Sequence, residues 1–194
     1  MNKKYLVVLL FFVFTTSYGY AQTNLGIRAG HNFFGVIKKV EGNRVKFSES
    51  NELMTLWQIG IAGEKAFNDR YAGHLDVMYF QQGWKDISLN YLKISPMFKL
   101  NSVPLKKMYV KTGVYFGYAL GGSEGSENLT FGKEGSRKAF DFGLGADIGF
   151  QFSKVQFGLS GQYGLVNISN AEKVSEHHIG IALNVTFFFL NFPK

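Results

Sequence analysis

A strict two-residue alternation of side chains constrains this chain more than any other feature. From Phe140 to Phe152 every even position is apolar, whereas the odd positions hold aspartate, glycine or glutamine. Successive side chains of a β-strand point to opposite faces, so this pattern predicts a strand with one wholly apolar face. An amphipathic helix would repeat its apolar residues every three or four positions, and it does not fit this segment.

The same alternation recurs along the chain and predicts eight strands, over residues 25–34, 56–66, 71–82, 89–100, 108–120, 140–152, 155–165 and 177–190. The long connections, 35–55, 121–139 and 166–176, all fall at one end of an up-and-down meander. Short turns at one rim and long loops at the other are typical of outer-membrane barrels. We therefore predict an all-β fold, an eight-stranded antiparallel up-and-down transmembrane β-barrel of OmpA/OmpX-like architecture.

The alternation alone does not say which face looks outward, because a soluble lipocalin barrel places its apolar face inside. Here the opposite face is crowded with glycine, which suits a narrow lumen, and it carries charged residues that would be costly in hydrocarbon. Aromatic residues also gather near both strand ends, as Trp57 and Tyr79 do at one end and Tyr71 and Phe98 at the other. Two aromatic girdles mark two membrane interfaces, so we expect the apolar face to contact lipid.

The N-terminal segment has the features of an export signal. Lys3 and Lys4 precede an apolar run over residues 5–14, and Gly19 and Ala21 stand at −3 and −1 of a cleavage site before Gln22. This pattern predicts a secretory signal peptide over residues 1–21 and a barrel domain over residues 22–194. We expect export to the outer membrane of a Gram-negative bacterium. The absence of cysteine excludes disulfide scaffolds and thiol nucleophiles.

Charged and amide residues on the glycine-rich face are the main candidate site. Three cations and four carboxylates stand there with a histidine and glutamines, and buried charges of both signs persist only when they are paired and hydrogen-bonded. We predict a polar plug of the lumen rather than a conducting path, because eight strands leave room only for side chains. The predicted lumen residues are Arg28, Glu64, His74, Asp76, Lys93, Lys111, Asp141, Asp147, Gln151 and Gln162.

Basic residues gather in two of the long loops. With a formal net charge of +7 the chain could suggest nucleic acid as a partner, but an exported barrel does not routinely meet it. Lipopolysaccharide phosphates lie nearer, and lysine or arginine would pair with them. We expect outer-membrane lipid and lipopolysaccharide as partners, a protein partner at the loops as a further option, and a monomer. The candidate loop cations are Lys38, Lys39, Arg44, Lys46, Lys133 and Arg137.

The hypothesis that the protein is an enzyme has weaker support in the sequence than a non-enzymatic barrel. His177 and His178 stand beside Ser175 and Glu176, which leaves open a lipid A-modifying enzyme at the outer rim, but no spacing fixes a nucleophile and its base. The glycines of residues 143–149 lie on a strand, where no helix N-terminus could hold a phosphate. We expect no catalytic residues, no cofactor and no metal, and a narrow channel remains a further alternative.

Several motifs resemble a known family, the small outer-membrane β-barrel domain proteins of Bacteroidota, which include porin-family and PorT-like proteins. They cover residues 20–22, 25–30, 75–83, 90–95 and 113–117. Lys93 replaces the acid usual in the family and Ser95 replaces its proline, so the interior charge pairing is expected to differ here. The resemblance implies an outer-membrane barrel without an assigned activity. It also implies an alternative role as an accessory component of an envelope machine such as type IX secretion.

Overall fold

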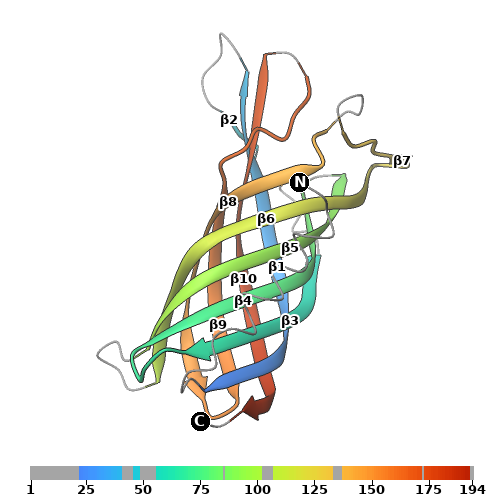
Figure 1. Cartoon of the computed structure of the whole chain (residues 1–194). Coiled ribbons are helices and arrows are strands. Elements are labelled where there is room, and N and C mark those ends of the chain that lie inside the picture. The colour runs from blue at the N-terminus through green and yellow to red at the C-terminus, as the bar shows by residue number, and fades with distance from the viewer. Residues whose placement is uncertain are drawn as a thin grey trace, which may run out of the picture.

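The computed structural model describes residues 22–40, 46–48, 56–84, 86–101, 107–132, 137–171 and 173–192. Eight long strands and two short ones, β2 and β7, make up the described fold (Figure 1). In the described part of the chain, no helix has the length and apolarity that crossing a membrane requires. The strands are β1 (Thr23–Val40), β2 (Lys46–Ser48), β3 (Leu56–Ala66), β4 (Tyr71–Trp84), β5 (Ile87–Asn101), β6 (Met108–Glu124), β7 (Glu127–Asn128), β8 (Phe140–Phe152), β9 (Val155–Gly164) and β10 (Val174–Phe192).

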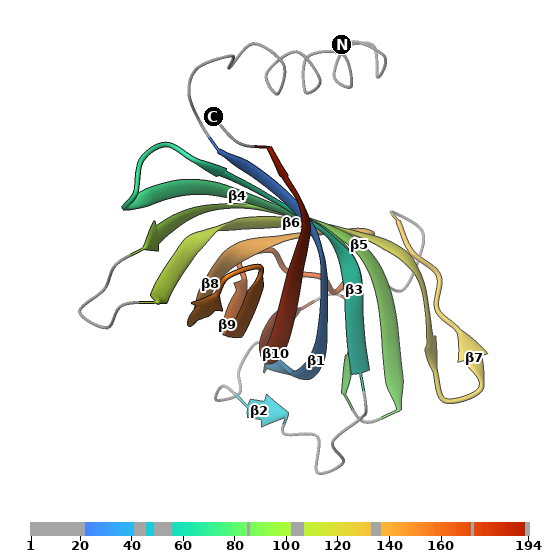
Figure 2. The ribbon, with the colours of Figure 1, turned by 90° about the horizontal axis from the view of Figure 1, so that it is seen from below.

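The eight long strands close into an antiparallel barrel. Each pairs with the next along the chain, and β1 pairs with β10 from Thr23 opposite Phe192 to Val40 opposite Val174. Figure 2 shows β1 and β10 side by side at this closure. The pairing leaves no free edge between the first and last strands, which confirms the predicted eight-stranded up-and-down barrel.

Several strands run further than the alternation predicts, mainly at the end with the long loops. Pairing of β4 with β5 continues to Trp84 opposite Ile87, so the predicted medium-length connection is a tight turn. Strands β1 and β10 likewise extend beyond the barrel, and β2 adds to β1 opposite Val36 to Lys38 (Figure 1). The apolar alternation covers the part of each strand that is expected to contact lipid, whereas backbone pairing continues beyond it. Sequence patterning therefore marks the membrane-facing part of each strand rather than its full length.

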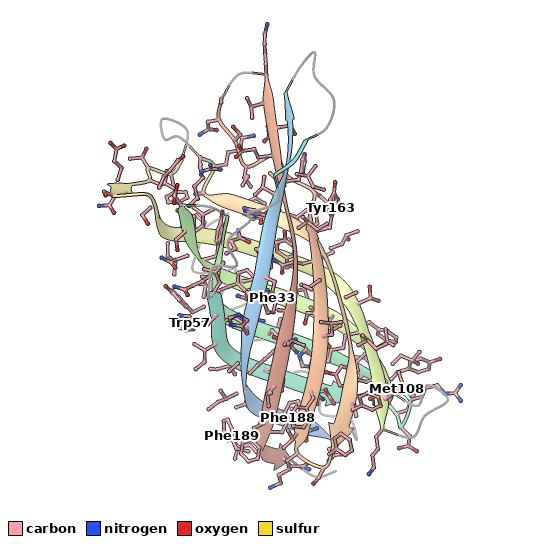
Figure 3. All side chains as sticks on the ribbon, turned by 180° about the vertical axis from the view of Figure 1, so that it is seen from behind. Phe33, Trp57, Met108, Tyr163, Phe188 and Phe189 are labelled. Carbon is pink, nitrogen blue, oxygen red and sulfur yellow. The ribbon has the colours of Figure 1, made fainter. Side chains whose placement is uncertain are left out.

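Large apolar side chains cover the outside of the barrel. Ile61 is 55% exposed and Leu144 is 51% exposed. Aromatic pairs lie toward both rims: the rings of Trp57 and Tyr79 are 5.2 Å apart, and those of Tyr71 and Phe98 are 5.4 Å apart. Figure 3 shows the outward side chains around the wall, with Trp57 on β3. The face assignment made from the sequence is therefore the one that the structure shows.

Glycines on the inner face give large side chains room to cross the lumen. An added Cβ at Gly149 or Gly158 would stand 2.6 Å and 2.5 Å from the hydroxyl of Tyr109. Tyr109 is 1% exposed, and its hydroxyl lies in the interior close to these two glycines. The density of glycine that the sequence shows on this face thus serves packing of aromatic rings inside the barrel.

Candidate functional site

The candidate site is the interior of the barrel, whose buried polar residues we call the lumen network. Toward the end with the short turns, Lys99 Nζ donates hydrogen bonds to Oε1 and Oε2 of Glu64 at 2.8 Å and 2.9 Å. It also donates to Oε1 of Gln151 at 2.6 Å. Gln156 Nε2 donates to Glu64 Oε2 at 3.0 Å, so this carboxylate is held from β5 and β9 together. Lys99 and Gln156 are fully buried.

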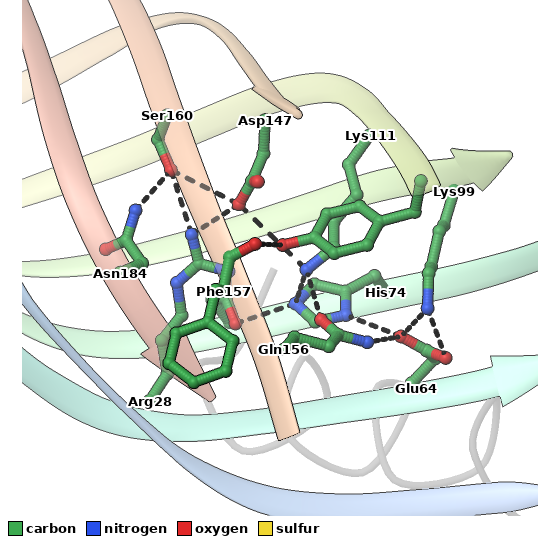
Figure 4. Close-up of polar contacts among 12 residues, drawn as sticks. Arg28, Glu64, His74, Lys99, Lys111, Asp147, Gln156, Phe157, Ser160 and Asn184 are labelled. Atoms are coloured by element: carbon green, nitrogen blue, oxygen red, sulfur yellow. Dashed lines mark hydrogen bonds and ion pairs between the residues drawn. The ribbon is translucent and has the colours of Figure 1, made fainter. Parts of the chain in front are cut away.

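His74 joins this layer to the middle of the lumen. Its Nε2 lies 2.9 Å from Asp76 Oδ1 and its Nδ1 lies 3.4 Å from Glu64 Oε2. Lys111 Nζ donates to Gln156 Oε1 at 3.0 Å and lies 4.0 Å from Asp147 Oδ2. Residues of β3, β4, β6, β8 and β9 therefore meet in one connected set of polar contacts (Figure 4).

Arg28 of β1 is the central cation of the network. Its Nη2 donates to Asp147 Oδ2 at 2.5 Å and to Ser160 Oγ at 2.9 Å, and its Nη1 lies 3.7 Å from Asp76 Oδ2. Ser160 in turn accepts a hydrogen bond from Asn184 Nδ2 at 2.6 Å. Figure 4 shows Arg28, Asp147, Ser160 and Asn184 converging from four strands. These contacts cross the lumen, because β1 and β8 are not neighbours in the sheet.

Lys93 lies beside a small, largely enclosed cavity. Its Nζ donates to Gln162 Oε1 at 3.1 Å and stands 3.6 Å from the centre of the Phe80 ring. The cavity measures about 20 Å³, and Arg28 and Ser95 are among the residues that line it. That volume holds one water molecule or one monoatomic ion, so the described side chains nearly fill the interior here.

A second carboxylate cluster lies nearer the long loops. Asp141 Oδ2 lies 2.8 Å from His178 Nδ1 and accepts a hydrogen bond from the hydroxyl of Tyr115 at 3.2 Å. Gln82 Nε2 lies 2.9 Å from the same ring nitrogen of His178. All four residues are buried, and they come from β8, β10, β6 and β4.

The outer end of the lumen is apolar, which differs from the wholly polar plug that the sequence predicts. A cluster that we call the apolar cap fills it, because the strands extend beyond the polar layers and bring apolar side chains over them. The rings of Phe34 and Phe80 meet edge to face at 5.1 Å. The buried residues of the apolar cap are Val36, Phe80, Ile87, Leu89, Tyr91, Ala119 and Ile168.

The structure places the ten predicted lumen residues inside the barrel and adds several that sequence reasoning missed. Lys99 shares the odd-numbered inward face of β5 with Lys93, so counting by twos from Lys93 would have found it. With Lys99 the buried charges of the membrane-spanning wall are four cations against four carboxylates: Arg28, Lys93, Lys99, Lys111, Glu64, Asp76, Asp141 and Asp147. Further additions are Gln82, Tyr115, Gln156, Ser160 and His178.

Arg137 is a correction to the predicted set of loop cations. The residue is 8% exposed, and its Nη1 donates to Glu176 Oε2 at 2.6 Å. Its backbone forms bridges to Phe131 and Ser169, which turn the side chain inward toward β10. Arg44 and Lys133 lie outside the described residues. For Lys38, Lys39 and Lys46 only the backbone, on β1 and β2, is described.

The rim residues considered for lipid chemistry separate in the structure. Ser175 Oγ lies 2.9 Å from His177 Nε2, but His177 Nδ1 lies 3.1 Å from the carbonyl oxygen of Gly164 rather than near a carboxylate. Glu176 turns inward to Arg137, and His178 turns inward to Asp141. Because neighbouring strand residues point to opposite faces, a Ser–His–Glu triad does not assemble from this segment.

The end of the barrel with the short turns is open. An accessible recess of about 650 Å³ lies there, lined by Glu64 and Gln151 of the lumen network and by residues of the turns and of both terminal strands. Phe188 of β10 is buried beside it (Figure 3). Among the described residues, no group of three or more histidine, aspartate or glutamate side chains is arranged to hold a metal ion.

Comparison with known proteins agrees with this architecture. OprG from Pseudomonas aeruginosa is 13% identical with a TM-score of 0.50, covering 90% of this chain and 96% of its own. Ail of Yersinia pestis is also 13% identical, with a TM-score of 0.46 and coverage of 87% and 100%. No curated protein matches the sequence. Residues 20–170 match the model of the outer membrane protein beta-barrel domain family. The chain therefore belongs to this family and is an outer-membrane β-barrel protein.

Proposed function

We propose that the protein is a non-conducting, non-enzymatic component of the Gram-negative outer membrane that presents its long loops at the cell surface. The lumen network carries this proposal. Its ion pairs join non-adjacent strands across the interior, the enclosed cavity beside Lys93 measures about 20 Å³, and the apolar cap covers the outer end. A hydrated ion needs a continuous water-filled path, and side chains occupy that path along the described part of the barrel.

Planar-bilayer recording of the refolded protein tests the plugged lumen. We expect no discrete conductance steps from protein that shows a heat-modifiable band on SDS gels, which reports the folded barrel. Recovery of the protein in floated proteoliposomes of the same lipid controls for insertion. Discrete openings in such preparations would overturn the proposal and make Arg28, Lys99 and Lys111 the first residues to test for ion selectivity.

We also propose that the chain reaches the outer membrane after cleavage before Gln22. Residues 1–21 lie outside the described residues, and the sequence pattern supports this step. N-terminal sequencing of protein from isolated outer membranes is expected to begin at Gln22. A sequence that begins at Met1 would contradict cleavage, whereas recovery in the inner membrane would contradict the location.

Lipopolysaccharide is the proposed ligand of the loops, and the protein is proposed to act as a monomer. The candidate cations are now Lys38, Lys39, Arg44, Lys46 and Lys133, since Arg137 pairs with Glu176. Replacing the first four together by glutamine should weaken binding to lipopolysaccharide micelles, whereas Lys107→Gln with Lys154→Gln, at the opposite end, should not. Equal binding by both variants would contradict the loop assignment.

A second candidate is an accessory role in an envelope machine, to which the resemblance to PorT-like proteins points. The observation that favours it is the open recess of about 650 Å³ at the end that carries the short turns, which faces the periplasm in this family's orientation. Crosslinking in cells from Asn68→Cys, on the rim of that recess, should capture a periplasmic partner, with Asn128→Cys at the outer end as the control. Capture of no protein would leave only the first proposal.

A further inference from the structure

We propose that the enclosed lumen cavity between β1, β5 and β9 is a binding site for one small monovalent anion of the size of chloride. The site is formed by Arg28 of β1, Lys93 and Ser95 of β5, and Gln162 of β9. This assignment goes beyond a structural plug, because it gives the lumen network a specific inorganic ligand.

The size of the cavity restricts the ligand. A volume of about 20 Å³ admits one water-sized occupant. Phosphate, sulfate and carboxylates are too large for it. The surrounding side chains are mostly inaccessible: Ser95 is 1% exposed, Arg28 is 3% exposed and Lys93 is 9% exposed. Only a monoatomic ion or a single water molecule fits such a site.

Hydrogen-bonding groups at the cavity are predominantly donors. On the residues that line the cavity, three buried atoms have no hydrogen-bond partner in the structure: Arg28 Nη1, Ser95 Oγ and Gln162 Nε2. Two of these are N–H groups that can only donate, and the hydroxyl of Ser95 can donate as well. A water molecule accepts two hydrogen bonds, whereas a halide accepts from every donor around it. With the ammonium of Lys93 as a third group that can only donate, the donors at the cavity outnumber the two hydrogen bonds that a water molecule accepts, which favours an anion.

Lys93 differs from the other buried cations of the wall in having no carboxylate partner within the described part of the chain. Lys93 Nζ contacts Gln162 Oε1 and the Phe80 ring, and among the described residues no carboxylate oxygen lies within 4.0 Å of it. The other three buried cations of the wall each have one: Arg28 and Lys111 have Asp147, and Lys99 has Glu64. Of these four buried cations, Lys93 is therefore the one that a bound anion would supply with a counter-charge.

Asp76 is the one carboxylate that lines the cavity, and it opposes an anion. Its two oxygens, however, are directed elsewhere: Oδ1 lies 2.9 Å from His74 Nε2, and Oδ2 lies 3.7 Å from Arg28 Nη1. Arg28 is already paired with Asp147 through its other terminal nitrogen, so Lys93 is the cation of the cavity lining that has no carboxylate oxygen within 4.0 Å among the described residues.

Crystallography of protein refolded in bromide tests the site directly. Bromide replaces chloride and gives an anomalous signal, so we expect one anomalous peak inside the barrel within hydrogen-bond distance of Lys93 Nζ and Gln162 Nε2. Lys93→Met should lose this peak while keeping the fold, and Lys173→Met, on an exposed outer loop, should retain it. A cavity that holds only water without anomalous signal in the wild-type protein would overturn the proposal.

A solution measurement covers the case in which Lys93→Met does not crystallise. Because an anion that binds only the folded state stabilises it, the midpoint of heat modifiability should rise by roughly 3–6 °C for each tenfold increase in bromide above the dissociation constant. The refolding buffers are matched in ionic strength with sulfate, which is too large for the cavity. Lys93→Met should show no bromide dependence, and a wild-type midpoint that is independent of bromide would contradict the site. Neither readout depends on conductance, so failure here is distinct from failure of the plugged-lumen proposal.

Discussion

Lys99 Nζ on β5 lies 2.8 Å from Glu64 Oε1 on β3, although β4 separates these two strands in the sheet. The ion pair therefore spans the concave inner face of the wall and forms only when the sheet curls. Both residues are buried, and Gln151 and Gln156 complete the hydrogen bonding of the pair. Interior contacts of this kind link closure of the barrel to satisfaction of its charges.

Removal of Lys99 should strongly destabilise the barrel. Lys99→Met leaves the Glu64 carboxylate buried without its ammonium partner, and such losses cost about 3–5 kcal/mol. Lys99→Met combined with Glu64→Leu should recover most of this free energy of unfolding, because neither charge then remains. Urea unfolding in detergent micelles, followed by tryptophan fluorescence, measures the difference. The control is Lys154→Met on an exposed turn, expected to change stability by less than about 0.5 kcal/mol.

Arg28 and Asp147 should show energetic coupling in a double-mutant cycle. Their side chains form a short ion pair between β1 and β8, so Arg28→Met and Asp147→Asn each remove the same contact. We expect the two changes together to cost less than their sum, with a coupling of about 1–3 kcal/mol. The cycle uses the same unfolding assay. Additive effects would show that the pair contributes no specific coupling.

Gly149→Ala should disturb folding, whereas Gly161→Ala should not. A Cβ at Gly149 would overlap the carbonyl oxygen of Phe157 and stand 2.6 Å from the Tyr109 hydroxyl, while nothing lies within 4 Å of a Cβ at Gly161. Overpacking of this kind costs about 1–3 kcal/mol. The fraction of heat-modifiable protein after refolding distinguishes the two variants. Equal yields would mean that both the Tyr109 side chain and the backbone at Phe157 can shift away from Gly149.

Asn167→Ala should loosen the outer end of β10 without unfolding the barrel. The side-chain amide of Asn167 accepts from the backbone N–H of Glu176 at 2.9 Å and donates to the carbonyl oxygen of Val174 at 3.1 Å. It therefore substitutes for a neighbouring strand along an edge that β9 does not reach. Hydrogen exchange at Glu176 should accelerate by about tenfold.

The control for this experiment is Asn128→Ala on the exposed strand β7, which should leave exchange at Glu176 unchanged. Exchange in the middle of β10, at Ala182 for example, should also stay slow in Asn167→Ala, because its pairing with β1 and β9 is intact. Faster exchange along the whole strand would show that Asn167 supports the barrel rather than only its outer end.

Strand β5 shows most clearly which features of the interior can be predicted from the sequence. The inward direction of Lys93 follows from alternation once the glycine-rich, charged face is assigned to the lumen, and the same count by twos would have identified Lys99. Alternation fixes which face a side chain occupies, because the pleat of a strand has a period of two residues. It does not say which partner the side chain meets, and Lys93 and Lys99 meet different ones: Gln162 with the Phe80 ring, and Glu64.

Arg137 is a residue whose side-chain direction could not be predicted from the sequence. Its position in a polar, basic loop predicted an exposed cation, yet the structure pairs it with Glu176. Loop residues carry no two-residue pattern, so their direction depends on how the loop returns to the barrel. The apolar cap was missed for a related reason, since its members come from strand ends and loops whose convergence no single segment encodes.

By itself, the sequence determined the number of long strands and their order along the wall, because both follow from local alternation and connection length. It also determined the face that meets lipid, through the glycine and charged residues on one face and the aromatic residues near the strand ends. Only the tertiary structure decided the pairs inside: Arg28 with Asp147, Lys99 with Glu64, His178 with Asp141, and Phe34 against Phe80. These contacts depend on the tilt and stagger with which the sheet closes. Closure brings together strands that are neither adjacent in the sheet nor close in the chain, and local patterning carries no information about that geometry.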